Sequence, residues 1–250
     1  MKRGLLYVVF GEQYDKLAAH AIAHSRQFTD LPICVLTNIK DRCEKWDEVN
    51  GVQFYHFPFP QKDNRLVKTR MIAFTPFDET LYLDCDSVIQ SPGIEQAFDM
   101  LDGHDMVLNL YTDWEVGDKV LRLYRKAMRL SETTLPLRLY NGAFICFRSN
   151  EAVSDFFIKW ANYWVLTGKG REMPALACAV KNSGIKVNVL PRDYFEPSAR
   201  NERCVVQHNY NSCEGKHFHQ EFGLPLIREY KPFDGGAQSD WNWVDFDGDQ

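Results

Sequence analysis

Two aspartates separated by one residue, Asp84 and Asp86, offer the most specific chemistry in this 250-residue sequence. They follow the apolar run at 80–83, which predicts a β-strand that ends just before the pair. Residues two apart on a strand project to the same face, so the two carboxylates should converge while Cys85 turns into the opposite layer. Bound Mg²⁺ or Mn²⁺ would relieve the repulsion between the carboxylates, because both are hard cations that prefer oxygen ligands. The simpler alternative is that the aspartates only begin a loop by accepting backbone hydrogen bonds.

A divalent ion held by this pair can also clamp two phosphates. A nucleoside diphosphate that leaves a sugar accumulates negative charge as the bond breaks. A metal that bridges its phosphates stabilises that charge without a proton. The position of the pair, at a strand end and downstream of a strand, helix, strand unit, favours the metal site over a plain loop.

The elements that must position the pair follow from hydrophobic periodicity. An apolar strand at 4–10, a helix at 13–28 and a strand at 31–36 predict the opening of an α/β sheet, whose ligands collect at the carboxyl ends of its strands. We expect one α/β domain of the Rossmann-like kind over 1–234, with a mixed, mostly parallel sheet flanked by helices, and an acidic, aromatic tail over 235–250. Further helices are expected at 66–74, 117–130, 153–166 and 174–182, and further strands at 107–110, 143–147, 185–190 and 204–207.

Composition narrows the class of partner. The formal net charge of -5 gives no overall basic field, which argues against nucleic acid and against an anionic membrane as the first expectation. No apolar stretch in the sequence is long enough to span a bilayer, so we expect no transmembrane segment. The seven cysteines are odd in number, and Cys34, Cys85 and Cys146 lie in strand-like runs, which favours a reduced, cytoplasmic chain.

Three segments resemble glycosyltransferase family eight, whose members have the GT-A fold. Residues 68–89, which contain Lys68-Thr69-Arg70 and Asp84-Cys85-Asp86, are similar to the block that leads into the D-x-D motif of the family. Residues 140–144 look like its Asn-Ser-Gly-Val-Phe stretch, and 206–208 stand at the place of its late metal-binding histidine. The resemblance runs from about residue 4 to residue 216.

The resemblance implies a metal-dependent transferase that moves a sugar from a nucleoside-diphosphate donor, with a UDP-sugar favoured, to an acceptor that the sequence does not identify. It favours retention of anomeric configuration. Mn²⁺ or Mg²⁺ would be bound by Asp84, Asp86 and His208, and the catalytic set would be Asp84, Asp86 and Glu172. The implied donor site comprises Phe10, Gly11, Tyr14, Lys68, Arg70, Asn141, Gly142 and Lys216.

The sequence departs from the family pattern at two places. Glu172 and Met173 stand where the family has Asp and Gln, and 208–216 does not reproduce the His, Gly, Lys-Pro-Trp ending. If the enzyme were inverting instead, it would need a carboxylate base, for which Glu172 and Asp193 are the candidates.

Several of these residues also have simpler interpretations. Lys68 and Arg70 fit a solvated helix face, Asn141-Gly142 fits a hairpin turn, and Glu172 fits the first turn of a helix. Tyr14 equally fits packing on its own helix. For the basic helix we favour a solvated face over contact with an acidic acceptor or a membrane; its cations are Lys119, Arg122, Arg125, Lys126 and Arg129.

A structural zinc site would compete for His208, because soft and borderline ligands cluster around it. The other candidate ligands are Cys204, Cys213, His217 and His219, although their spacing matches no common zinc module.

Three rival functions use the same residues differently. In a haloacid-dehalogenase-like phosphatase Asp84 would be the phosphoryl-accepting nucleophile, and the late acidic pair would have to be Asp247 and Asp249. A nucleotidyltransferase would need a Gly-rich basic loop that residues 11–13 do not supply. A sugar-nucleotide-binding protein without turnover stays open because of the changed pair at 172–173.

Overall fold

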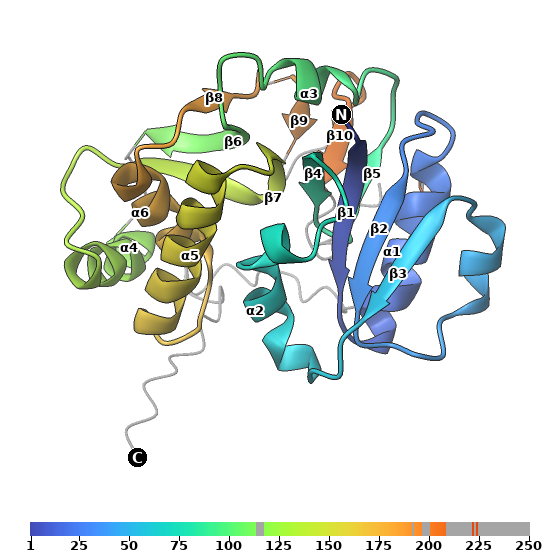
Figure 1. The fold of residues 1–250 in the computed structure, drawn as a ribbon, viewed down its shortest axis with the longest axis horizontal. Coiled ribbons are helices and arrows are strands. Elements are labelled where there is room, and N and C mark those ends of the chain that lie inside the picture. Colours follow the sequence, from blue (N-terminus) through green and yellow to red (C-terminus); the bar gives the residue numbers. More distant parts are fainter. Residues whose placement is uncertain (114–117, 192, 197–200, 209–221, 223, 225–250) are drawn as a thin grey trace, which may run out of the picture.

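A seven-stranded sheet in the order β3-β2-β1-β4-β7-β6-β8 forms the centre of the computed structural model (Figure 1). The structure describes residues 1–113, 118–191, 193–196, 201–208, 222 and 224. β7 runs antiparallel to both of its neighbours, whereas the other pairings in this sheet are parallel. The strands are β1 (Arg3–Val9), β2 (Ile33–Thr37), β3 (Val52–His56), β4 (Glu79–Leu83), β6 (Met106–Asp113), β7 (Arg138–Arg148) and β8 (Val187–Val189).

The central strands form because they are apolar on both faces. Along β1, Leu5 and Tyr7 belong to one hydrophobic core while Leu6 and Val8 belong to the other. Since side chains alternate along a strand, a strand covered on both sides reads as a continuous apolar run. β2 and β4 are buried along their whole lengths for the same reason.

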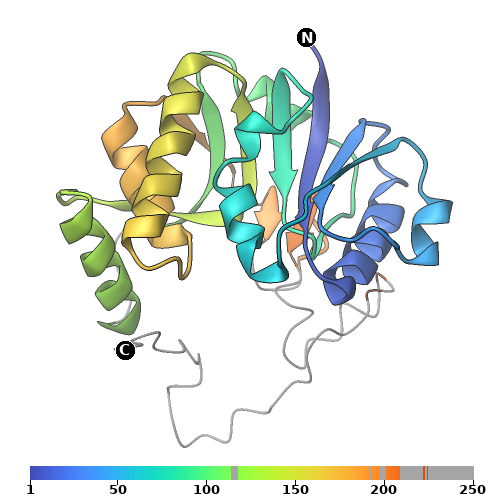
Figure 2. The ribbon, with the colours of Figure 1, turned by 60° about the horizontal axis from the view of Figure 1, so that its bottom comes forward.

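Helices cover the two faces of the sheet separately (Figures 1 and 2). α1 (Glu12–Ser25) and α3 (Gln96–Asp99) contribute to the first core. α2 (Asn64–Lys68), α5 (Glu151–Leu166) and α6 (Met173–Ser183) contribute to the second, in which aromatic side chains of α5 pack against Phe147 of β7. α4 (Asp118–Leu130) lies beside α5 and α6 at the edge of this layer.

A small second sheet lies directly after the aspartate pair. It joins β5 (Ser87–Ile89), β10 (Val206–His208) and β9 (Phe195–Glu196) in the order β5-β10-β9. β10 is antiparallel to β5, and His208 is paired with Ser87. Because Ser87 follows Asp86, this register brings a histidine far along the chain next to the aspartates.

The fold class predicted from the sequence is confirmed: the sheet is mixed and mostly parallel, and helices flank it. The sequence missed β3 because it is an edge strand whose side chains are half-buried or exposed, so it lacks a continuous apolar run. The helix expected at 66–74 is instead α2 followed by a 3₁₀ turn at Met71–Ala73. The acidic tail at 235–250 lies outside the described residues.

No helix in the described part of the chain combines the length and apolar character needed to cross a bilayer.

Candidate metal and donor site

Three potential metal ligands meet where the large and small sheets join. The Nε2 atom of His208 lies 3.1 Å from Oδ1 of Asp86 and 4.0 Å from Oδ2 of Asp84. Each of the three residues offers one ligand atom within 4.8 Å of the others. Two ligands bonded to one octahedral Mg²⁺ at about 2.1 Å would be about 3 Å apart if adjacent and about 4 Å apart if opposite. The donor atoms therefore fit a small divalent cation, as the sequence predicted.

The aspartates converge through a turn rather than along a strand. β4 ends at Leu83, and the carbonyl of Asp84 accepts a hydrogen bond from the amide of Ser87 at 2.9 Å. The amide of Asp84 donates to the carbonyl of Ala143 on β7 at 3.0 Å, which fixes the start of this turn. Cys85 packs against the hydrophobic core, but it also lines the cavity beside the two aspartates, so the middle residue does not turn fully away from them.

One oxygen of Asp84 is held from the opposite side of the site. Its Oδ1 accepts hydrogen bonds from Nζ of Lys68 at 3.0 Å and from the hydroxyl of Tyr82. These donors leave Oδ2 as the oxygen that faces His208. Two fixed donors on one oxygen orient the carboxylate before any cation binds, which lowers the cost of ordering a metal ligand.

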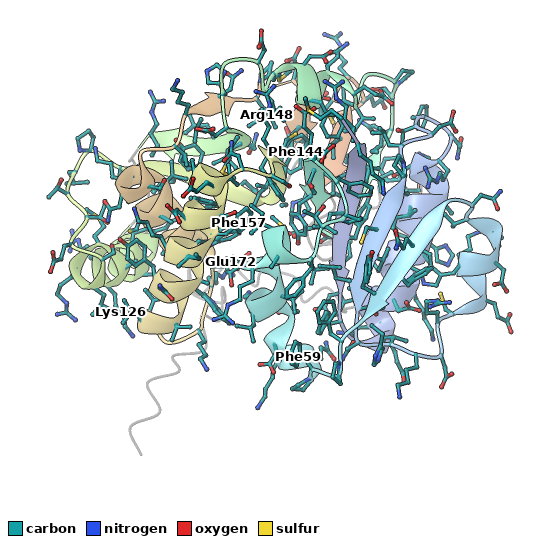
Figure 3. The ribbon with its side chains drawn as sticks, in the orientation of Figure 1. Phe59, Lys126, Phe144, Arg148, Phe157 and Glu172 are labelled. Atoms are coloured by element: carbon teal, nitrogen blue, oxygen red, sulfur yellow. The ribbon has the colours of Figure 1, made fainter. Side chains whose placement is uncertain are left out.

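Lys68 also binds a second carboxylate, that of Glu172. Its Nζ lies 2.8 Å from Oε1 of Glu172, and Nε of Arg65 lies 3.0 Å from Oε2. Lys68 and Glu172 are both buried, while Arg65 is partly exposed. Figure 3 shows Glu172 between the ribbon of α2 and that of α5. The carbonyl of Glu172 accepts from Nε1 of Trp160 on α5, which anchors the residue that precedes α6.

Both partners of this pair are ionised at neutral pH. Burial alone would raise the pKa of Glu172, but the charges of Lys68 and Arg65 outweigh it and lower the pKa to about 2. Burial alone would lower the pKa of Lys68, but the charges of Asp84 and Glu172 outweigh that effect and raise it above its ordinary value. The network thus links two carboxylates through one buried ammonium group.

A cavity of about 150 Å³ opens onto these side chains. Its lining includes the charged side chains of the two aspartates, Lys68 and Glu172, and the aromatic residues Phe10 and Tyr14. The remaining lining residues are Val8, Asn64, Arg65, Tyr82 and Cys85. The lining therefore combines three carboxylates and the ammonium group of Lys68 with aromatic side chains.

Comparisons with known proteins were made at three levels. Protein-family models and curated proteins give no match to the sequence. Among solved structures, the galactosyltransferase LgtC in complex with donor and acceptor sugar analogues superposes with a TM-score of 0.58, over 90% of this chain and 98% of that chain, at 10% identity. Mouse xyloside xylosyltransferase 1 in its apo form gives a TM-score of 0.59, over 85% and 99% of the two chains, at 11% identity. The bifunctional glycosyltransferase WbbM gives 0.56 over 83% of this chain and 45% of its own, at 12% identity.

The chain has the GT-A fold. At these identities the likeness concerns the fold and not the substrates. Within the GT-A fold, the aspartate pair lies between the large sheet and the small one, and β10 supplies the histidine.

Of the eight predicted donor residues, three line the cavity in the structure. Phe10, Tyr14 and Lys68 line the cavity. Gly11, which follows Phe10, is the N-cap of α1 with a φ of 98°, and a Cβ there would lie 2.5 Å from the side chain of Gln61. Only glycine accepts both constraints without strain.

Asn141 and Gly142 lie inside β7, so the alternative of a hairpin turn is wrong. A Cβ on Gly142 would lie 3.4 Å from both Lys68 and Glu172, which places this glycine against the ion pair. The Asn141 side chain accepts from the amide of Ala143 at 2.8 Å and thus shapes the strand that supports Asp84.

Besides Gly11, Asn141 and Gly142, two predicted donor residues are not among the described residues that line the cavity. Arg70 is exposed beyond the end of α2 and does not line the cavity. The solvated-face interpretation therefore fits Arg70 but not the buried Lys68. Lys216 lies outside the described residues.

The zinc alternative loses one of its ligands. The Sγ of Cys204 is buried and hydrogen-bonded to the carbonyls of Asn201 and Val206, each at 3.2 Å. Within the described residues, the grouping that could hold a metal around His208 is the one with the two aspartates. The other zinc candidates, Cys213, His217 and His219, fall outside the described residues.

Sequence reasoning missed two side chains of the network, although both carried a signal. Tyr82 stands two residues before Asp84 and therefore on the same face of the strand end. Arg65 stands one helical turn before Lys68, at the spacing that places two side chains on one face of a helix. Neither signal is specific until the position of Glu172 is known.

The ion pair makes a testable contribution to acid stability. Because the pKa of Glu172 is lowered from 4.5 to about 2 in the folded state, its stabilisation is complete above about pH 4.5 and is lost as the pH falls towards 2. We expect Glu172→Gln to lower the free energy of unfolding by up to about 3 kcal/mol at neutral pH. The difference in free energy of unfolding between the variant and the unchanged protein should become smaller below pH 4.5. Urea unfolding at pH 7, 4.5 and 3.5 measures this gap. The exposed change Glu202→Gln serves as the control, and a gap that stays constant with pH would contradict the assignment.

Proposed function

We propose that this chain is a divalent-metal-dependent glycosyltransferase that transfers a sugar from a nucleoside-diphosphate donor, with a UDP-sugar favoured. One observation carries the proposal: Asp84, Asp86 and His208 converge with the spacing of a small hard cation in a GT-A fold. We further propose that the cation is Mn²⁺ or Mg²⁺, since the two carboxylates suit either ion.

When bound, the cation would supply positive charge that stabilises the departing diphosphate. The side chains of the protein orient Asp84 and line the cavity. Lys68 and Tyr82 hold Asp84 in place, and the ammonium group of Lys68 adds positive charge beside the cavity. Tyr14 offers an aromatic ring for the base, Phe10 lines the pocket, and Gly142 leaves room beside the ion pair.

Glu172 acts, in this proposal, as a positioning residue rather than as a base. Both of its oxygens are bound to cations, and a carboxylate with a pKa of about 2 accepts a proton poorly at neutral pH. Asp193, the other candidate base, is exposed and does not line the cavity. The absence of a suited base among these two supports transfer with retention of configuration.

A cytoplasmic location is part of the same proposal. No disulfide joins the six cysteines that the structure describes, and four of them are buried. Such cysteines are typical of a reducing compartment.

Turnover assays test the function directly. The purified chain should hydrolyse or transfer from one of a panel of UDP- and GDP-sugars in the presence of Mn²⁺ or Mg²⁺, and EDTA should abolish this activity. Activity that survives EDTA would refute the metal-dependent mechanism. Binding of the donor by calorimetry without turnover would instead identify a sugar-nucleotide-binding protein.

The phosphatase alternative has its own readout. There Asp84 would attack a phosphoryl group, but its Oδ1 is already engaged by Lys68 and Tyr82. The late acidic pair that such a phosphatase would need, Asp247 and Asp249, lies outside the described residues. Hydrolysis of p-nitrophenyl phosphate at a rate above that of any sugar nucleotide would favour it.

A further inference from the structure

A cationic and aliphatic surface lies away from the cavity, where α4 meets the end of α5. We name it the α4–α5 face and define it by Arg125, Lys126, Arg129 and Leu130 of α4 together with Val165, Leu166 and Lys169 at the end of α5. The four cations are exposed. The exposed fractions of the aliphatic side chains are 54% for Leu166, 42% for Val165 and 38% for Leu130.

The two segments of this face are neighbours in space. A Cβ built on Gly168, two residues after the end of α5, would lie 3.9 Å from Nζ of Lys126. Leu130 follows Lys126 by one helical turn, and Leu166 precedes Gly168 by two residues. Residues three and four apart share one face of a helix, so Lys126, Arg129 and Leu130 lie on one face of α4, next to the end of α5.

The local charge of the face is opposite to that of the chain. The sequence carries a net charge of -5, yet residues 119–131 and 156–171 contain no aspartate or glutamate. The nearest acidic residue along α4 is Glu132, which is exposed just after the helix. The overall charge thus conceals a basic patch that the sequence analysis interpreted as a solvated helix face.

The orientation of the face relates it to the cavity. β1 runs towards the lower side of Figure 1, and Lys126 lies on that lower side in Figure 3. The cavity lies at the carboxyl ends of β1 and β4, because Phe10 and Asp84 line it. The α4–α5 face and the carboxyl ends of β1 and β4 thus both lie towards the lower side of these views.

We propose that the α4–α5 face docks reversibly on an anionic lipid surface. Anionic headgroups complement the four cations, and the boundary between headgroups and acyl chains accommodates exposed leucine and valine side chains. A purely acidic polymer would satisfy the cations but would leave these aliphatic side chains without apolar partners. The combination of both kinds of side chain on one face favours a membrane surface.

Binding to vesicles tests the proposal with the full chain. We expect co-sedimentation with vesicles of phosphatidylcholine and phosphatidylglycerol at low ionic strength, and at least tenfold weaker binding at 0.5 M salt or to pure phosphatidylcholine, because surface charge is screened or absent. Lys126→Glu combined with Arg129→Glu should weaken binding at least tenfold. Leu166→Ser should weaken it while leaving its salt dependence unchanged.

The matched control is Lys181→Glu combined with Lys186→Glu, which changes the net charge equally at exposed positions outside the face. It should bind vesicles as the unchanged protein does. Equal loss in both double variants would overturn the proposal in favour of a nonspecific charge effect. Binding to soluble poly-glutamate but not to vesicles would overturn it in favour of an acidic polymer.

This docking does not depend on the proposed transferase activity, and the two can fail separately. Donor hydrolysis without vesicles should be the same in the Lys126→Glu, Arg129→Glu variant and in the unchanged chain, because neither residue lines the cavity. If the chain binds vesicles but turns over no sugar nucleotide, the docking proposal is supported and the proposed transferase function is refuted.

Discussion

Replacing Asp86 with alanine is expected to lower metal-dependent donor turnover at least about a hundredfold, because it removes one of three ligands from the proposed cation site. Mn²⁺ affinity, measured by electron paramagnetic resonance of the free ion, should fall at least about tenfold. Asp86 is buried and lies 3.1 Å from His208, so the variant also leaves the imidazole without its nearest carboxylate.

Two further variants separate loss of the metal from loss of structure. Asp86→Asn keeps the shape of the side chain but removes its charge, and we expect it to bind Mn²⁺ weakly while folding normally. Asp102→Ala removes an exposed aspartate away from the site and should leave turnover unchanged. Full Mn²⁺ affinity in Asp86→Ala would show that the cation, if bound, does not use this carboxylate.

Replacing Lys68 with methionine is expected to lower the free energy of unfolding by about 3–5 kcal/mol. The change leaves the buried carboxylate of Glu172 with only the partly exposed Arg65 as its cation, and it removes one of the two donors to Oδ1 of Asp84. A buried charge without its partner costs far more than an exposed one. Urea unfolding in the presence of EDTA measures this loss without a contribution from bound metal.

A double change tests whether the loss belongs to the pair. Lys68→Met combined with Glu172→Met should cost less than the sum of the two single changes, since the second removes the charge that the first left unpaired. Lys62→Met, at an exposed lysine, should change the free energy of unfolding by no more than about 0.5 kcal/mol. If Lys68→Met costs no more than this control, the buried network does not stabilise the fold.

The double change should not restore catalysis even where it restores stability. Asp84 would still lack the ammonium group that orients Oδ1, and the cavity would have lost a positive charge. Recovery of stability without recovery of turnover would therefore distinguish the structural role of Lys68 from its role in the site.

The sequence by itself determined the layered architecture and the aspartate pair. Continuous apolar runs such as β1 and β4 report burial on both faces, and this information is local to the run. The D-x-D spacing at a strand end, after a strand, helix, strand unit, likewise predicted a cation site, and the structure brings the two carboxylates together. The edge strand β3 was not predicted, because its half-buried and exposed residues form no strong hydrophobic pattern.

The family resemblance had implied His208 and Glu172 as site residues, but only the tertiary structure decided how these distant side chains meet the aspartates and Lys68. His208 meets Asp86 because β10 pairs with β5 in one register, and such long-range pairing leaves no mark in the spacing of residues. Glu172 had the sequence signature of an ordinary helix start, yet the packing of α6 brings it against Lys68, and the two charges offset the cost of burying each other. Local periodicity encodes which surfaces are buried, whereas the partners of a buried charge depend on how those surfaces stack.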